Sequence, residues 1–420
     1  MGQFKTLLGY EIKKICTRKS TWITFAVLIL AYLLSVILTW SVTYSNVHTR
    51  EGEREEWHDS YAKRKARERE NGMYWSGRKI DNVLLADVGK EYGKVLEEAG
   101  AGAEKAEVFQ REIERFSPIE NVLDSLTGGE MLLAKDDGQG NGSLTEEKIY
   151  QARKELVKSY QAEYGLSTEE CGYWQEKEKL LPKQFTMEYA EGFYQLISMS
   201  GNGIYMVILY ISFLLAVVAG RVFAEEHQRR ADQVILCSRN GKRQLYYAKI
   251  AAGILFAVFA VTVMLCIVVA LTFFLYGTEG FSAALQLVAG WYSYPLSVGE
   301  VLLIMLFISV LVVVLTSILI MVVSEKFCSS VAAMAVVIAV IAGSRLIVIP
   351  RGFPVLSQIW NFLPLNLLKL DQGFLDVRLV SVFGRQFTSW QFAPVLYLVS
   401  GVVLVFLGRR VYCRYQVQGR

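Results

Sequence analysis

The residues of this 420-residue chain that could do chemistry are charged side chains beside long apolar segments. The loop from Arg221 to Lys249 lies between two such segments and contains seven basic and three acidic residues. In its middle lies a short apolar run, Val234, Ile235 and Leu236, which we call the apolar knob. The charged residues on either side of it, which we call the rim, are Arg229, Arg230, Asp232, Arg239 and Arg243. This combination predicts docking on another protein, because apolar contacts give affinity and charges give specificity. A basic loop without a partner is the alternative interpretation.

Catalytic chemistry is not predicted. The chain contains no GxxxxGK[ST], HExxH, CxxC or GxSxG motif, and its Gly-rich stretch 138–143 lacks the lysine of a phosphate loop. His48, Glu51, Glu55 and His58 would share one helix face, but exposed Glu and His meet by chance in a charge-dense helix. We therefore expect no catalytic, cofactor-binding or metal-binding residue and no nucleic-acid partner. Any energy from ATP must come from another chain.

Six long intervals lack Asp, Glu, Lys and Arg in a chain that is 53% hydrophobic. A helix needs about 20 such residues to cross a bilayer, where only a helix satisfies its own backbone. The pattern predicts an all-α polytopic membrane protein with six transmembrane helices. Their apolar cores are Trp22 to Thr43, Ile204 to Gly220, Ile250 to Tyr276, Val301 to Val323, Val331 to Ile349 and Phe392 to Gly408.

A seventh charge-free interval, 281–299, is less apolar than the six. Its clustered aromatic residues favour an interfacial segment, and a seventh span would place the basic C-terminal tail outside. The seven-span topology is therefore the alternative to six spans.

Charge predicts the orientation. Residues 45–200 have 22 basic and 31 acidic residues, a net −9, whereas the rest of the chain has 22 basic and 9 acidic residues, a net +13. Because positive residues concentrate in the cytoplasm, both termini and the loop 221–249 are predicted inside. The block 45–200 is then extracellular, and the tail 413–420 is cytoplasmic. Cys171 is the one cysteine predicted to face outside.

Residues 1–19 predict a basic amphipathic helix that leads into the first transmembrane helix, 20–44. Its apolar face is Phe4, Leu7, Leu8, Ile12 and Ile15, and lysines lie elsewhere on the helix. Such a helix can lie in the inner membrane interface, although a solvated arm is the alternative. The following apolar run is too long for a cleaved signal peptide, so we expect an uncleaved anchor.

The extracellular block is predicted to be helical, because its apolar residues recur every three and four positions. The charge-dense run Arg50 to Glu70 is expected to extend the first transmembrane helix as a solvated helix. Breaks are predicted at Asn71-Gly72, 100–102, Gly128-Gly129 and 136–143.

The loop 221–249 resembles that of the permeases of type-2 ABC exporters. The matching elements are the acidic pair Glu225 and Glu226, the helix around Asp232 to Leu236, Ser238, the basic turn Asn240 to Arg243, and Lys249 opening the next span. The resemblance implies that 228–238 is a coupling helix docking on a separate nucleotide-binding ATPase, which would hold ATP and Mg. The residues it implies in coupling are Glu225, Glu226, Asp232, Leu236, Ser238 and Arg239.

The resemblance covers the membrane portion, including five further helices in 201–412. Residues 350–391, with Trp360 to Pro364 and Val382 to Gly384, resemble the external amphipathic helices of these permeases. The large external insertion departs from compact family members. A second permease, identical or a sister chain, is also implied by the resemblance.

Two charges near predicted outer ends of spans, Arg345 and Glu300, are candidates for an outer vestibule. Snorkelling to the nearby surface is the alternative for both. The resulting expectation is an ATP-driven exporter subunit for an amphipathic or hydrophobic substrate such as a peptide, drug or lipid-like molecule. The alternative is a membrane receptor or scaffold whose external helices bind a peptide or protein. An ion channel is not favoured, because no acidic ring or carbonyl filter is present.

Overall fold

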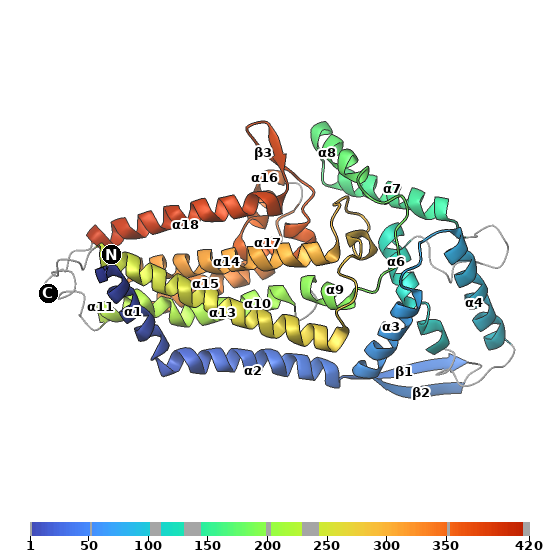
Figure 1. Ribbon diagram of the computed structural model, residues 1–420, viewed down its shortest axis with the longest axis horizontal. Helices are drawn as coiled ribbons and strands as arrows, with labels where there is room; N and C mark the ends of the chain where they lie inside the picture. Colours follow the sequence, from blue (N-terminus) through green and yellow to red (C-terminus); the bar gives the residue numbers. More distant parts are fainter. Residues whose placement is uncertain are drawn as a thin grey trace. The chain divides into compact units, whose positions relative to one another are not determined.

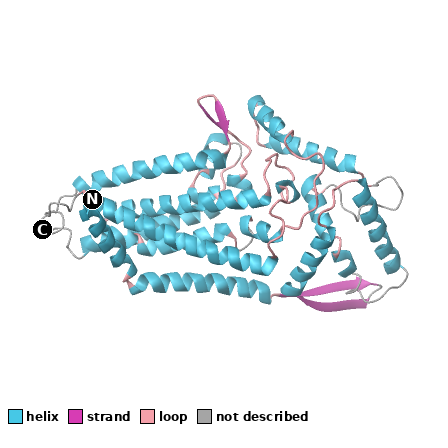
Figure 2. Cartoon of the chain, viewed as in Figure 1, coloured by secondary structure: helices cyan, strands magenta, loops and turns pink. Residues whose placement is uncertain are grey.

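The computed structural model describes residues 2–50, 53–100, 111–129, 144–198, 203–228, 243–350 and 353–414, and most of these are helical (Figure 2). The chain divides into two compact units. Unit 1 comprises Met1–Leu34, Ile197–Ala270 and Ile304–Arg420, and unit 2 comprises Ser35–Leu196 and Leu271–Leu303. Three long helices have residues in both units. These are α2 (Lys19–Ser41), α13 (Gln244–Tyr276) and α14 (Val298–Phe327).

Five helical segments are long and apolar enough to cross a membrane: Lys19–Ser41, Ile204–Glu226, Gln244–Tyr276, Val298–Phe327 and Ser389–Arg414. They coincide with five of the six predicted spans. The remaining prediction corresponds to α15 (Ser330–Leu346), which has 17 residues and a length of about 26 Å. This helix ends before Ile349 because Ile347 adopts an extended conformation. Residues 281–299 form no such helix, so the seven-span alternative gains no support.

Unit 1 contains most of the apolar helices. Its other elements are α1 (Gly2–Cys16), α10 (Ile204–Val218), α11 (Gly220–Gln228), α16 (Pro354–Asn361), α17 (Pro364–Leu367), the π-helix η3 (Leu370–Phe374), β3 (Val380–Val382), β4 (Arg385–Phe387) and α18 (Ser389–Arg414). Helix α10 is buried along most of its length and packs against α15 and α11 (Figure 1). The hydroxyl of Tyr246 on α13 donates to the carbonyl oxygen of Val405 on α18 at 2.9 Å.

Close approach of α13 and α14 depends on a glycine. A Cβ atom at Gly253 would lie 2.4 Å from Sδ of Met321, a distance that would force the side chain or helix to move. Helices approach closely where one presents a small residue, and membrane helices use such sites frequently. The apolar pattern predicts both helices, and the absence of a side chain at Gly253 leaves room for Met321 where they meet.

The segment between α15 and α18 is not wholly helical, which corrects one expectation. Val382 to Gly384 was expected among external amphipathic helices, but it lies at the turn of the β3–β4 hairpin. Phe383 and Gly384 both have positive φ, at 50° and 76°. A two-residue hairpin turn of this kind requires positive φ at both positions, and Gly384 provides one without strain.

Unit 2 is built mainly from short helices. Its elements are β1 (Thr43–Arg50), β2 (Glu53–Ser60), α3 (Tyr61–Trp75), α4 (Asn82–Gly100), α6 (Ser117–Thr127), α7 (Glu146–Glu163), α8 (Thr168–Glu178), α9 (Glu191–Ile197, whose last residue belongs to unit 1) and the 3₁₀-helix η2 (Leu285–Leu287). Helix α6 packs against α3, α7 and η2. Trp75 is fully buried, and its indole N–H donates to the carbonyl oxygen of Arg115 at 3.0 Å.

The prediction of a solvated helix from Arg50 to Glu70 is wrong for its first half. β1 and β2 pair antiparallel in a register that runs from Thr43 opposite Ser60 to Arg50 opposite Glu53, and helix begins only at Tyr61. Strands are stabilised by partners across the sheet, which a local charge pattern does not reveal. His48, Glu55 and His58 therefore lie on strands rather than on one helix face, and Glu51 lies outside the described residues. Among the described residues no cluster of His, Cys, Asp or Glu could hold a metal.

Two predicted breaks have different outcomes. Gly128 ends α6 with φ of 67°, as expected for a helix terminating at a left-handed glycine. In contrast, α3 continues through Asn71 and Gly72. A Cβ atom at Gly72 would lie 2.3 Å from the Tyr189 ring, so this glycine serves close packing inside the helix.

The aromatic segment 281–299 folds as part of unit 2 rather than as a long helix. Gln286 is fully buried, and its amide donates to the carbonyl oxygens of Tyr292 and Tyr294 at 3.2 and 2.7 Å. The Ser125 hydroxyl on α6 donates to the Gln286 carbonyl at 3.1 Å. Buried polar groups are stable only when paired, so these bonds hold the segment against α6.

Candidate functional site: a buried ion network beside the loop 229–242

Lys249 occupies the first turns of α13 and has a completely buried side chain. A buried ammonium is stable only if acceptors replace water. Its Nζ donates to Oε1 of Glu226 at 2.7 Å, to Oε2 of Glu11 at 3.4 Å and to the carbonyl oxygen of Val222 at 3.0 Å. An ammonium has three donors, and each of them has an acceptor here.

Glu226 is the second centre of the network. It lies on α11 and is 7% exposed. Besides Lys249, it accepts from Nζ of Lys14 on α1 at 3.0 Å. Glu11, Lys14, Glu226 and Lys249 carry two positive and two negative charges, so the network is neutral. Such a pairing offsets the large cost of removing each charge from water.

A second ion pair lies at the edge of the network. Arg18, just after α1, pairs with Glu225 on α11, and both side chains are partly exposed. Arg221, also on α11, donates to the hydroxyl of Ser20 at 3.1 Å. The network and these contacts therefore join three elements that are distant in sequence: the N-terminal helix α1, the end of the second predicted span and the start of the third (Figure 1).

Aromatic rings cover the network. The centroid of the Phe223 ring lies 5.4 Å from Lys249 Nζ, and the ring packs against the rings of Tyr246 and Tyr412. A cation over an aromatic face gains favourable electrostatic interaction, and the rings exclude water. The network therefore lies at a junction of α11, α13 and α18 that is sealed on this side by apolar and aromatic groups.

Two of the six predicted coupling residues lie in the described part of the chain, and both are paired within it. Glu225 contacts Arg18, and Glu226 contacts Lys14 and Lys249. Asp232, Leu236, Ser238 and Arg239 lie outside the described residues, as does most of the predicted coupling helix 228–238. The roles predicted for these four residues stay predictions.

The two predicted vestibule residues have local partners. Arg345, near the end of α15, lies over the Tyr205 ring at 5.1 Å from its centroid. Glu300 accepts from the backbone N–H of Ser297 at 2.9 Å, and its own N–H donates to the Ser297 hydroxyl at 3.1 Å. This reciprocal arrangement caps the start of α14. A role for either residue in a vestibule stays a prediction.

Sequence reasoning identified Glu225, Glu226 and Lys249 as parts of a motif but missed the residues of 1–19 that pair with them, which are Arg18, Lys14 and Glu11. A signal for Glu11 was present, because it is the only acid among five basic residues in 1–19. Its partner is 238 residues away along the chain. No sequence period links positions so far apart, and the fold alone brings them together.

The interfacial helix predicted for 1–19 corresponds to α1. Its lysines Lys5 and Lys13 are exposed, whereas Ile15 is buried and Leu7, Leu8 and Ile12 are half-buried. The apolar face is thus partly covered by unit 1 itself. Its placement in the membrane interface stays a prediction.

Comparison with known families agrees with this architecture. A family model described as ABC-2 family transporter protein matches residues 6–372. The chain belongs to the ABC-2 transporter family. This ABC-2 chain is therefore a multi-pass transmembrane permease subunit of an ABC transporter, and the subunit is not itself catalytic. Neither a curated protein nor a solved structure matches it significantly.

The family match relates the position of the ion network to the partner of such permeases. Permeases of the ABC-2 family generally work with an ATPase partner. In this permease the network flanks both ends of the loop 229–242, since Glu226 precedes that loop and Lys249 follows it. Glu226 and Lys249, the described residues on either side of the segment 229–242, thus both contact helix α1.

Proposed function

We propose that the chain is the transmembrane subunit of an ATP-driven exporter that moves an amphipathic or hydrophobic substrate, such as a peptide, drug or lipid-like molecule, out of the cell. The observation that carries the proposal is the buried network of Glu11, Lys14, Glu226 and Lys249. Family membership supports transport, and the apolar spans suit such a substrate. ATP and Mg would be bound by the partner ATPase.

The network supports a route for force from an ATPase to the permease. In the proposal, residues 228–238 form the coupling helix, and the ATPase docks on Leu236 with Asp232 and Arg239 at the rim. A displacement of this helix would move α11, α13 and α1 together, because breaking their shared buried ion pairs costs several kcal/mol. Rigid-body movement of packed helices is a common means of alternating access.

The proposal includes a topology and an assembly. Both termini and the loop 229–242 lie in the cytoplasm, residues 45–200 lie outside, and α15 completes six spans in the cytoplasmic membrane. Two permeases, identical or sister chains, pair with two ATPases. The charge asymmetry of −9 against +13 supports the orientation.

Co-purification tests the docking proposal directly. The full chain, solubilised in detergent from its own cells, should bring down a stoichiometric ATPase. An Asp232→Arg, Leu236→Arg variant should lose it, because the apolar knob would carry charge. A matched Glu176→Arg, Leu180→Arg variant changes an exposed acid and an exposed leucine on unit 2, and it should retain the ATPase.

Two results would contradict the proposal. If the wild-type chain brings down no ATPase while a known transporter keeps its own, the receptor or scaffold function becomes the better explanation. If both variants retain the ATPase equally, docking takes place elsewhere on the chain.

A further inference from the structure

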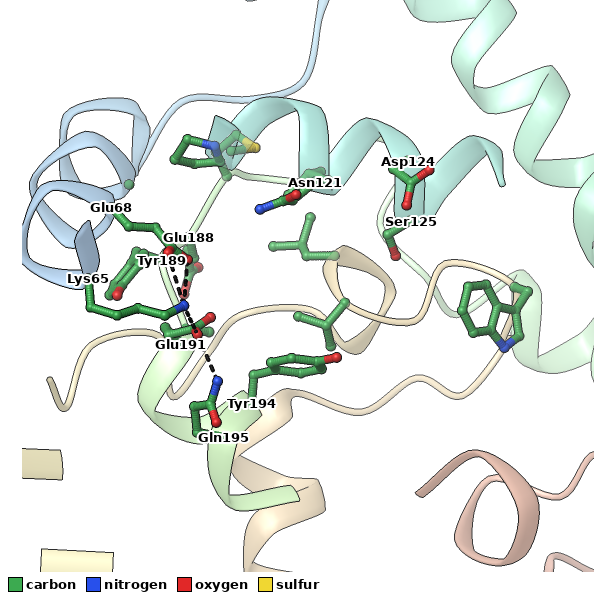
Figure 3. A pocket seen from close by; sticks show the side chains of 18 residues that line it. Lys65, Glu68, Asn121, Asp124, Ser125, Glu188, Tyr189, Glu191, Tyr194 and Gln195 are labelled. Atoms are coloured by element: carbon green, nitrogen blue, oxygen red, sulfur yellow. Dashed lines mark hydrogen bonds and ion pairs between the residues drawn. The ribbon is translucent and has the colours of Figure 1, made fainter. Parts of the chain in front are cut away.

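Unit 2 contains a cavity of about 510 Å³. Sites for small molecules typically have volumes of about 300–1,000 Å³. Three helices line it with residues three and four positions apart, so that one face of each points inward. They are α3 through Lys65, Glu68 and Gly72, α6 through Asn121, Asp124 and Ser125, and α9 through Glu191, Tyr194 and Gln195 (Figure 3).

Lys65 is surrounded by carboxylates at one end of the cavity (Figure 3). Its Nζ lies 2.9 Å from Oε2 of Glu68 and 2.7 Å from Oε1 of Glu191, and Glu191 also accepts from the Gln195 amide at 2.9 Å. Two carboxylates thus share one ammonium. Burial, with the charge of Glu191 added, raises the pKa of Glu68 above its ordinary value.

Two further carboxylates line the cavity without a basic partner among the described residues. Glu188 lies near Lys65 and accepts from the Ser282 hydroxyl at 2.9 Å, and Asp124 lies toward the other end (Figure 3). The lining therefore has four carboxylates against one ammonium. An anionic ligand would be repelled, whereas a cation would relieve this excess of negative charge.

The rest of the lining is apolar and aromatic. It includes Val122, Met187, Leu287, Val288, Trp291 and Tyr194. Indole and phenol rings attract organic cations, and the aliphatic side chains favour an apolar body on the same ligand. An inorganic cation fits less well, because the described residues contain no group of three or more His, Cys, Asp or Glu close enough together to hold a metal.

We infer that this cavity binds an amphipathic organic cation, with its ammonium or guanidinium group beside Glu188 and Glu68 and its apolar part against the Leu287 to Trp291 wall. This inference goes beyond the proposed function, because binding in unit 2 needs neither an ATPase nor transport. A protonated amine joined to an aromatic or aliphatic group, including a basic side chain of a peptide, has the required chemistry.

Binding of tryptamine to the purified full chain tests the inference. The chain is held in nanodiscs of neutral phosphatidylcholine, and calorimetric titration is compared with empty nanodiscs. Tryptamine should bind saturably with one site per chain. Tryptophol, a neutral analogue, should bind at least about tenfold more weakly, and the anionic indole-3-acetate should not bind.

Matched variants locate the site. Glu188→Gln and Asp124→Asn remove negative charges that form no described ion pair, so folding should be unchanged, and together they should weaken tryptamine binding at least about tenfold. Glu176→Gln, an exposed acid outside the cavity, should leave it unchanged. The thermal unfolding midpoint of each variant reports whether it folds.

Three results would overturn the inference. They are equal binding of tryptamine and tryptophol, no saturable binding by a folded wild-type chain, and unchanged binding by a folded double variant. Millimolar Ca²⁺ can be added as a competitor. If it abolishes tryptamine binding without affecting folding, the cavity is instead an inorganic cation site. Failure of ATPase co-purification would leave all these results unchanged, so the two proposals are tested separately.

Discussion

Lys249 and Glu226 form a buried ion pair, with 2.7 Å between Nζ and Oε1, across the two ends of the loop 229–242. Glu226 is the last residue but two of α11, and Lys249 lies in the second turn of α13, which begins at Gln244. Because Glu11 and Lys14 on α1 join the same pair, the three helices share one charge-balanced centre. The pair therefore fixes the geometry on either side of the loop that we propose as the docking element.

Removing Lys249 should strongly destabilise the chain. Lys249→Ala leaves Glu226 and Glu11 buried without their shared cation, a change that typically costs about 3–5 kcal/mol. Thermal unfolding of the full chain in detergent measures the effect. Lys5→Ala, an exposed lysine on α1, is the matched control and should shift the midpoint little.

A double variant separates lost charge from lost packing. Lys249→Met with Glu226→Gln removes one charge of each sign and leaves Glu11 and Lys14 in balance. It should be more stable than Lys249→Ala, since the double variant keeps the network neutral, whereas Lys249→Ala leaves it with an excess negative charge. If Lys249→Ala unfolds at the wild-type temperature, the network does not hold the helices together.

Gly290 should not tolerate alanine. A Cβ atom there would lie 2.1 Å from the carbonyl oxygen of Ser125, whose hydroxyl also accepts from the Gly290 N–H at 2.9 Å. Gly290→Ala should force the aromatic segment away from α6 and destabilise unit 2 by about 1–3 kcal/mol. Trp fluorescence during thermal unfolding is a suitable measurement, since Trp291 adjoins the site.

Gly89 provides the control for this substitution. It lies in α4, is exposed and has no atom within 4 Å of a built Cβ. Gly89→Ala should stabilise the helix by about 0.5–1 kcal/mol, because alanine loses less backbone entropy. Equal effects of the two substitutions would argue against the tight contact between Gly290 and Ser125.

The stability of unit 2 should fall at acid pH through Asp59. The Arg67 guanidinium, which hydrogen-bonds the Asp59 carboxylate, holds the pKa of that carboxyl below its ordinary value of 3.8. A carboxyl with a lowered folded pKa contributes stability that is present above its unfolded pKa and lost as pH falls through the folded pKa. We expect Asp59→Asn to cost about 1–2 kcal/mol at pH 7 and much less near pH 3.

Glu68 should act in the opposite sense. Burial raises its pKa above 4.5, so its contribution to folding is greatest below that value and declines as pH rises through the folded pKa.

Unfolding midpoints of wild type and Asp59→Asn between pH 3 and pH 7, measured on the full chain, isolate the Asp59 effect. A difference between the two that is constant with pH would contradict the assignment to Asp59.

Cysteine labelling tests the proposed orientation. Cys171 is half-buried at the start of α8, and Cys16 is exposed at the end of α1. In intact cells, a membrane-impermeant maleimide should label a variant that keeps only Cys171 and should spare one that keeps only Cys16. After the membrane is permeabilised, the Cys16 variant should label as well. The reverse pattern would place the 45–200 block inside.

The distribution of charge along the sequence determined most of the membrane architecture. A bilayer excludes unpaired charges and unsatisfied backbone, so charge-free intervals of about 20 residues mark spanning helices. Five of the predicted spans therefore agree with the structure, and the family resemblance in 221–249 agrees with the family match. These properties are local, because each depends on residues within a single helix or loop.

The contacts between segments that are distant in the sequence depend on the tertiary structure alone. Glu11 meets Lys249 across 238 positions, and Ser125 meets Gly290 across 165 positions, although no periodicity relates them. The β1–β2 hairpin replaced an expected helix because strands are stabilised across the sheet rather than along the chain. The acidic cavity likewise exists only where α3, α6, α9 and the 287–291 segment come together. Contacts of this kind depend on packing and burial between distant segments, which a linear sequence does not display.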